Sequence, residues 1–498
     1  MTFYSLLGIK TVDDAAGDVS VLHDAIVLVE MPDGVVPNLT YTLEPIPFPD
    51  GGPFPVVDVN VPGLIGAETA GEPDFANSED HFGFVTHPGG TSYFMNFHHY
   101  GPGQPSVNYN FLIGGAALPD FVGAADPVAR WFNFGDSVTA QGGVTSGPFA
   151  PEALIPFNSI PGSIAYTGEE IFTYDDEFNE FETGGGNDFV VVGGEDWNQI
   201  NTGAGDDLVR VDNRDVRTGV DVDFGTGNDI LDLSLVTDAS IFLEHYDPLP
   251  NGITVDINGL TNLGREDKGA GGQTVIVDVV NALNTDGVSV FGTGFDDVFN
   301  LTSSEGAWWG GGFMMVRGYG GDDEINVGDS NGTVRIDYRE SPEGIVANLS
   351  TGIVQDGFGI TDTLAGNIRD LCGSMHTDHI TGSALDDRII LMAGNDTLDG
   401  GAGSDTSRYD RSRVEAVTVD LETGTATGVW RDESFSHTLI NVENVYGSRE
   451  GADMIAGDGA GNQLRGEGGD DTLLGRDGDD TLVGHEGDDV IDGGAGLD

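Results

Sequence analysis

The chain has 498 residues, of which 84 are Asp or Glu and only 19 are Lys or Arg, so its formal charge is −65. Because nucleic acids and anionic lipids are repelled by so acidic a surface, the composition argues against both as main partners and favours metal cations. A hydrophobic content of 38% is enough for packed cores, which excludes a purely disordered acidic polymer.

Residues 1–146 are expected to form an N-terminal β domain. The stretches SYFMNFHHY and SVNYNFLIG alternate apolar and polar residues, and PFPVVDVNVPG is typical of another strand. We therefore predict a β-sandwich or jelly roll here. Its first residues, MTFYSLLGIKTVDDAAGD, have no basic leader, so we expect no Sec signal peptide. The sequence contains no stretch of about 18 apolar residues, so we expect no membrane span. Residues 147–165 hold four prolines and are predicted to be a linker.

Two weak chemical motifs lie in the N-terminal domain. Four histidines could hold zinc together with Asp80, but neighbouring residues of a strand point to opposite faces, so ordinary surface or core histidines are favoured. The segment GDSV at 135–138 is similar to the nucleophile block of one lipase family, without a recognisable partner triad. The four histidines are His81, His87, His98 and His99.

Degenerate repeats occupy residues 166–240, and β-rich spacers with further degenerate repeats occupy 241–372. Each degenerate copy has Gly residues shortly before an Asp and apolar residues after it. Trp308 and Trp309 could stack on a sugar, although packing beneath a loop is commoner. The segment GDSNG at 328–332 matches a nucleophile elbow, but a strand follows where a helix is needed. Cys372 is predicted to be a buried structural thiol, since one Cys cannot form an intrachain disulfide.

Two regular arrays, residues 373–408 and 448–498, repeat every nine residues. Each unit has a Gly-rich turn, an Asp, and an aliphatic residue two positions after the Asp. A spacer of predicted strands, residues 409–447, separates the arrays and begins YDRSRVEAVTVDL; a similar spacer begins at Tyr338. Both spacers read as a strand, a Gly-containing turn, a strand and an apolar segment, and we interpret them as structural adaptors.

The spacing of these units explains what they could bind. Gly residues allow turn conformations with positive φ that expose carbonyl oxygens, while Asp adds a carboxylate to the same turn. Stacked turns would offer clusters of hard oxygen ligands, which suit Ca²⁺. The aliphatic residue points inward from a short strand, and neighbouring strands must stack to bury it.

At the segments GEGGDDTLL, GRDGDDTLV and GHEGDDVID, the sequence resembles the RTX family, whose nonapeptide is GGxGxDxUx. The resemblance implies an all-β chain with parallel β-roll arrays, several Ca²⁺ ions between successive turns, and export by type I secretion. Asn462 departs from the pattern. A capping segment should follow the last repeat, so we expect the chain to continue beyond Asp498. The implied calcium ligands are Asp188, Asp207, Asp229, Asp297, Asp323, Asp378, Asp387, Asp396, Asp405, Asp453, Asp471, Asp480, Asp489 and Asp498.

Two classes of function fit these observations. The first is a non-enzymatic, calcium-ordered surface or matrix protein, such as an adhesin, filament or S-layer component, in which residues 1–165 make a contact. The second is an exported hydrolase or polysaccharide lyase with its catalytic site in residues 1–165. Since no convincing catalytic constellation is recognisable and repeats dominate the chain, the first is favoured. Residues 373–498 are expected to be largely unfolded without calcium, and calcium-dependent self-association or cell-surface attachment is expected with it.

Overall fold

The structure is a computed structural model. In it the chain forms two compact units. One unit is Met1–Ser240 with Ile257–Arg265 and Gly271–Ala282, and the other is Ile241–Asp256, Glu266–Ala270 and Leu283–Asp498. The described residues are the strands within 2–166, and then 168, 170–173, 178–194, 197–213, 217–246, 249–302, 313–328, 334–411, 413–431 and 433–498.

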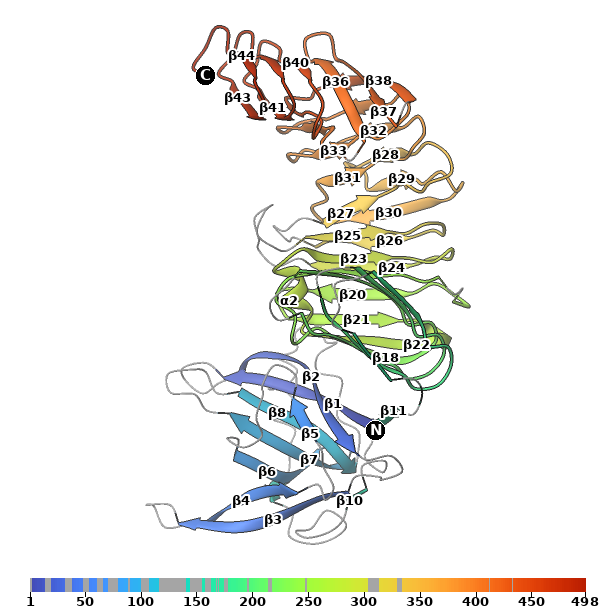
Figure 1. The fold of residues 1–498 in the computed structure, drawn as a ribbon, viewed down its shortest axis with the longest axis vertical. Helices are drawn as coiled ribbons and strands as arrows, with labels where there is room; N and C mark the ends of the chain where they lie inside the picture. The colour runs from blue at the N-terminus through green and yellow to red at the C-terminus, as the bar shows by residue number, and fades with distance from the viewer. Residues whose placement is uncertain are drawn as a thin grey trace. The chain divides into compact units, whose positions relative to one another are not determined.

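The first eleven strands pair antiparallel (Figure 1). The central strand β1 pairs with β2, β8 and β11, and β6 pairs with β7 and β9. The strands are β1 (Thr2–Asp13), β2 (Val19–Met31), β3 (Asn38–Pro47), β4 (Pro53–Asn60), β5 (Gly66–Thr69), β6 (Glu79–His87), β7 (Gly90–His99), β8 (Val107–Gly115), β9 (Ala140–Gly143), β10 (Ile155–Pro156) and β11 (Ser163–Tyr166). The all-β prediction is confirmed, while the sandwich or jelly roll stays a prediction.

After β11 the chain forms parallel strands that stack on one another. The strands β12, β14, β16, β18 and β22 follow one another in one sheet, and β13, β15 and β17 do so in a second. Their bounds are β12 (Glu170–Thr173), β13 (Asn179–Glu182), β14 (Phe189–Val192), β15 (Trp197–Asn201), β16 (Leu208–Val211), β17 (Thr218–Asp223), β18 (Gly227–Asp232) and β22 (Gly272–Val277). Five further elements have residues in both units: β19 (Ala239–Leu243), β20 (Thr254–Asn258), β21 (Leu263–Asp267), η3 (Gly269–Gly271) and α2 (Val279–Leu283).

The apolar core of these first stacked strands is closed by residues of the N-terminal strands. Ile26 of β2 and Tyr166 of β11 pack in one buried cluster with Phe189 and Leu208. The Tyr166 ring lies 5.9 Å from that of Phe189, and its hydroxyl is 2.7 Å from Ser5 Oγ. The hydroxyl is thus satisfied although the ring is buried, as a buried Tyr requires.

Within the second unit the strands form two sheets. The long sheet contains β24 (Val298–Thr302), β26 (Glu324–Asn326), β28 (Val346–Asn348), β29 (Ile353–Gln355), β30 (Thr361–Ala365), β32 (His379–Thr381), β34 (Thr397–Asp399), β36 (Val414–Asp420), β37 (Thr425–Trp430), β38 (Glu433–Ile440), β40 (Met454–Ala456), β42 (Thr472–Leu474) and β44 (Val490–Asp492). The short sheet contains β23 (Gly287–Phe291), β25 (Met314–Arg317), β27 (Val334–Asp337), β31 (Asp370–Cys372), β33 (Arg388–Ile390), β35 (Thr406–Arg408), β39 (Asn444–Tyr446), β41 (Gln463–Gly468) and β43 (Thr481–Glu486). In the two arrays the chain alternates between the sheets, so same-sheet neighbours are 18 residues apart.

The aliphatic residue of a nine-residue repeat lies at the centre of its strand, and in most repeats it is buried in the core, whereas Ile491 in the last strand is 49% exposed. In the long sheet Ile380 pairs with Leu398, and Ile455 pairs with Leu473. All four are at most 2% exposed, as the spacing predicts. One methyl-rich residue per strand is too little for an independent core, so burial depends on the neighbouring strand in the stack.

The spacers enter the long sheet as antiparallel hairpins. Strand β36 pairs with β37, and β37 with β38, while β38 and β36 pair in parallel with β34 and β40. The spacer β28, β29 and β30 repeats this arrangement between β26 and β32. The sequence predicted two strands and an apolar segment, and that segment becomes the third strand because it pairs with the preceding array. Both hairpin turns use a positive-φ glycine, Gly352 or Gly424.

Candidate functional site

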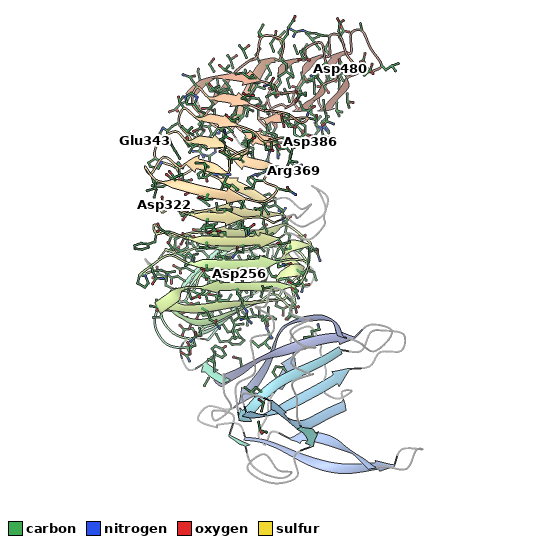
Figure 2. All side chains as sticks on the ribbon, turned by 180° about the vertical axis from the view of Figure 1, so that it is seen from behind. Asp256, Asp322, Glu343, Arg369, Asp386 and Asp480 are labelled. Carbon is green, nitrogen blue, oxygen red and sulfur yellow. The ribbon has the colours of Figure 1, made fainter. Side chains whose placement is uncertain are left out.

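The predicted ligands lie in turns that join the sheets. We call the segment that ends at each such Asp, and precedes the strand, an Asp turn. Turns that enter the long sheet and turns that enter the short sheet lie on opposite edges of the second unit. Figure 2 shows Asp322 and Glu343 on one edge and Arg369 and Asp386 on the other.

Asp turns on one edge are linked by a repeated hydrogen bond. The backbone N–H of one Asp donates to Oδ1 of the Asp in the next turn, at 2.8 to 3.1 Å. All fourteen predicted ligands take part, in the pairs Asp188 to Asp207, Asp207 to Asp229, Asp297 to Asp323, Asp378 to Asp396, Asp387 to Asp405, Asp453 to Asp471, Asp471 to Asp489, and Asp480 to Asp498. The carboxylates are therefore held in columns, at fixed positions along each edge.

Glycines make the space that the carboxylates occupy. A Cβ added to Gly466 would lie 2.0 Å from Asp471 Oδ2, and one added to Gly484 would lie 1.9 Å from Asp489 Oδ2. Later in the turn, Gly487 has a φ of 137° and would place a Cβ 1.9 Å from the carbonyl oxygen of Gly469 in the turn before. Carboxylate and carbonyl oxygens thus approach each other where only glycine fits.

Several carboxylates have a buried oxygen without a hydrogen-bond partner. Oδ2 is in this state in Asp207, Asp323, Asp405, Asp471 and Asp480. Asp396 Oδ2 also lacks a hydrogen bond, although His437 Nε2 is 3.2 Å away. Burial lowers the pKa of His437 to about 3, so this ring is neutral and brings no charge to the carboxylate.

The pKa values of several of these buried carboxyl groups, Asp207, Asp323 and Asp396 among them, are raised. Burial raises the pKa of Asp323 and of Asp396 to about 8, and that of Asp207 to about 7. Neighbouring carboxylates in the column add to the rise, such as Asp378 beside Asp396. A cation bound at these turns would offset both causes of the raised pKa. It would contact the carboxylate oxygen that lacks a hydrogen bond, and its positive charge would balance the neighbouring carboxylates.

Calcium fits this donor set. An unpartnered carboxylate oxygen and glycine-exposed carbonyls are hard oxygen donors, which suit a hard cation. Within the described ranges no three His, Cys, Asp or Glu side chains gather as a metal cluster, so backbone carbonyls would have to complete each site. The Asp residues named above would hold the ion, which would supply charge neutralisation and crosslink successive turns.

A second kind of Asp turn, which we call a hydroxyl turn, provides hydrogen-bond donors to its own carboxylate. In four turns a Ser or Thr near the start donates its hydroxyl to Oδ1 and its backbone N–H to Oδ2 of the Asp. The hydroxyl distances are 2.6 to 3.0 Å and the N–H distances 2.5 to 2.8 Å. The pairs are Thr293 with Asp297, Ser374 with Asp378, Ser383 with Asp387, and Ser448 with Asp453.

Sequence reasoning missed two parts of these columns. Asp362 is the second residue of β30, and its Oδ1 accepts from the N–H of Asp323 at 3.2 Å. The hydroxyl turns were also missed. Asn462, which departs from the pattern, accepts from the N–H of Asp458 through Oδ1 at 2.8 Å, and its amide contacts Asp458 Oδ1 at 3.3 Å. A Ser or Thr four or five residues before the Asp was the available signal.

A cleft of about 570 Å³ lies in the second unit beside Asp turns. Its lining is mainly aromatic and includes Tyr246, Phe295, Tyr319 and Phe358. His245 also lines it, with Nε2 at 2.7 Å from Glu266 Oε1. The cleft therefore offers flat apolar faces, and the Asp carboxylates of the columns do not line it.

The remaining sequence candidates divide between described and undescribed residues. Cys372 is fully buried, as predicted, and burial raises the pKa of its thiol to about 12. The side chains of His81, His87, His98, His99 and Asp80, and residues 135–138, Trp308, Trp309 and most of GDSNG, lie outside what the structure describes.

Three non-glycine residues adopt the left-handed backbone conformation in the last array. Glu467, Arg476 and His485 have φ of 74°, 76° and 74° where the repeat has its second Gly. We expect the double substitution Glu467→Gly with His485→Gly to stabilise the calcium-loaded protein by about 1 to 2 kcal/mol, because Gly lacks the Cβ clash. Thermal melts should show this. The matched double Ala variant keeps the clash and should show no gain; equal gains with Ala would contradict the explanation.

Comparison with known families agrees with this geometry. Residues 373–406, 449–482 and 465–498 match the model described as the RTX calcium-binding nonapeptide repeat (4 copies). No curated protein matches the chain. Among the described residues no helix has the length and apolarity to cross a membrane. The matched segments contain the columns from Asp378 to Asp405 and from Asp453 to Asp498, and they are RTX repeats.

Proposed function

We propose that this chain, whose residues 373–406 and 449–498 carry RTX calcium-binding repeats, is a secreted structural or adhesive protein of the cell surface or extracellular matrix. In this proposal Ca²⁺ binds at the Asp turns, type I secretion exports the chain, and calcium-loaded chains associate with each other or with the cell surface. The observation that carries it is the set of buried Asp oxygens without partners in columns along both edges of the roll.

Calcium would control both folding and association. Without the ion, a column of carboxylates repels itself, and the formal charge of −65 keeps chains apart. Low free calcium in a cytosol would keep the chain exportable, and millimolar calcium outside would order the turns. Neutralised chains could then approach, and contacts between identical stacked bodies give filaments or lattices when the rotation does not close.

The test of the assembly role is light scattering and electron microscopy of the full chain. We expect large particles or filaments in millimolar calcium and dispersed chains after chelation, with magnesium at equal concentration as the control for non-specific charge screening. A protein that binds calcium and stays monomeric would contradict the structural role and favour an exported enzyme.

A further inference from the structure

The hydroxyl turns occupy a regular place in the chain. In the array 373–408, Ser374 belongs to the first Asp turn on one edge and Ser383 to the first on the other. Ser448 belongs to the first turn of the array 448–498, and the Asp458–Asn462 pair closes the first turn on its other edge. Thr293 likewise precedes the Asp323 turn. In the two regular arrays, 373–408 and 448–498, no later turn has a Ser or Thr four or five residues before its Asp.

The two kinds of turn treat the carboxylate differently. Asp378 receives the Ser374 hydroxyl at 2.6 Å and the N–H groups of Ser374 and Ile345, both at 2.8 Å. In the next turn on that edge, Asp396 receives a single hydrogen bond, from the N–H of Asp378 at 2.9 Å. A carboxylate with three donors needs no further partner, whereas one with a single donor carries an uncompensated buried charge.

The hydroxyl also fixes the turn itself. Ser374 Oγ accepts from the N–H of His376, and Ser383 Oγ accepts from the N–H of Leu385, both at 3.0 Å. Ser448 Oγ accepts from the N–H of Gly451 at 3.1 Å. Each hydroxyl therefore donates to the carboxylate and accepts from the backbone, so it crosslinks the turn from both sides without an ion.

Position in the stack explains why the first turns differ. The element before each first turn on the long-sheet edge is a spacer hairpin, which contributes one N–H, from Ile345 to Asp378 at 2.8 Å and from Val417 to Asp453 at 2.7 Å. A site between two turns needs oxygen ligands from both. A first turn has another Asp turn on one side only, since the spacer segment lies on the other side.

We propose that every calcium array of this chain starts with turns that close without calcium, in which a Ser or Thr hydroxyl, or the Asp458–Asn462 pair, takes the place of the ion. Calcium then acts only on the later turns, which in the two regular arrays are those of Asp396, Asp405, Asp471, Asp480, Asp489 and Asp498. The first turns form a preordered edge on which the calcium turns assemble. This inference rests on the proposed calcium function and narrows the region that calcium must order.

Hydrogen–deuterium exchange of the full chain in chelator and in calcium tests the inference. Without calcium we expect amides of residues 373–390 to stay protected and those of 391–408 to exchange rapidly; calcium should protect both. In Ser374→Ala with Ser383→Ala, exchange of residues 373–390 in chelator should rise on the order of tenfold or more, because each carboxylate loses a buried donor. Thr397→Ala removes a hydroxyl from the same array without touching a carboxylate, and should leave exchange unchanged.

The outcomes separate the proposed calcium function from the inference about the first turns. If calcium protects no segment, the calcium function itself is wrong. If calcium is needed equally by residues 373–390 and 391–408 in the wild-type chain, calcium binding survives and the hydroxyl inference is overturned. The wild-type measurement alone decides this, so a Ser variant that fails to fold leaves the test intact.

Discussion

Removing calcium should unfold residues 391–408 and 463–498, and restoring it should refold them. Binding to the folded state alone stabilises by about 2.7 kcal/mol per site at a hundredfold excess of ion over Kd, so a few sites exceed the stability of an ordinary domain. Circular dichroism during chelation and calcium return measures the change. A β signal that is unaffected by chelation would refute the coupling of calcium to folding.

The variant Asp480→Asn sharpens this expectation. The amide keeps the shape of the side chain and loses the charge, so the variant should melt at lower temperature than wild type in calcium. In chelator, where residues 463–498 of the wild type are expected to be unfolded, the variant should show no less β signal than wild type, because one negative charge of the column is gone. The neighbouring Asp479 is exposed, and Asp479→Asn should change little in either condition. A loss of stability in both conditions would instead show that Asp480 has only a packing role.

Acid should stabilise the calcium-free protein. The pKa values of Asp207 and Asp323, which lie outside the segments expected to unfold, are raised in the fold to about 7 and about 8, above the ordinary value of about 3.9 in an unfolded chain. Between the pKa of the unfolded chain and the raised pKa of the fold, the folded state therefore binds more protons than the unfolded state. The stability of the fold falls as the pH rises through this range. The slope is about 1.4 kcal/mol per pH unit for each proton released on unfolding.

Thermal melts in chelator between pH 5 and pH 8 measure this effect. We expect the melting temperature to rise as the pH is lowered from 8 to 5, because protons neutralise the carboxylates that calcium would otherwise neutralise. In saturating calcium the trend should weaken or reverse, since protons compete with the ion for the same oxygens. A chelated protein that loses stability between pH 8 and pH 5 would contradict the raised pKa values.

The nine-residue spacing made much of the roll predictable. An Asp and an aliphatic residue kept in phase require a repeated backbone, and the structure places Leu398 and Leu473 in the core as that pattern demands. The fourteen Asp positions were readable for the same reason. Their alignment into columns follows once parallel strands stack in register.

Other features depend on contacts between residues far apart in the chain. Asp362 stacks on Asp323 although 39 residues separate them, because the β28 and β29 hairpin is inserted between these strands in the sequence. The position of Ser374, four residues before Asp378, was a signal in the sequence, but only the folded turn shows that its hydroxyl donates to that carboxylate. Spacing reveals a repeat, but it does not show which partner satisfies each carboxylate.

The spacer hairpins also give the roll a direction of curvature. Between β34 and β40 the long sheet gains three strands, whereas the short sheet passes from β35 to β41 through β39 alone. At about 4.8 Å per strand, each spacer makes one side about 10 Å longer than the other, which acts as a wedge. Both spacers of the second unit widen the same sheet, so their bends add, and within this unit Figure 1 shows the strands after β38 turning toward the short sheet. The number of spacers between arrays thus sets the arc of the roll, independently of how many calcium ions it holds.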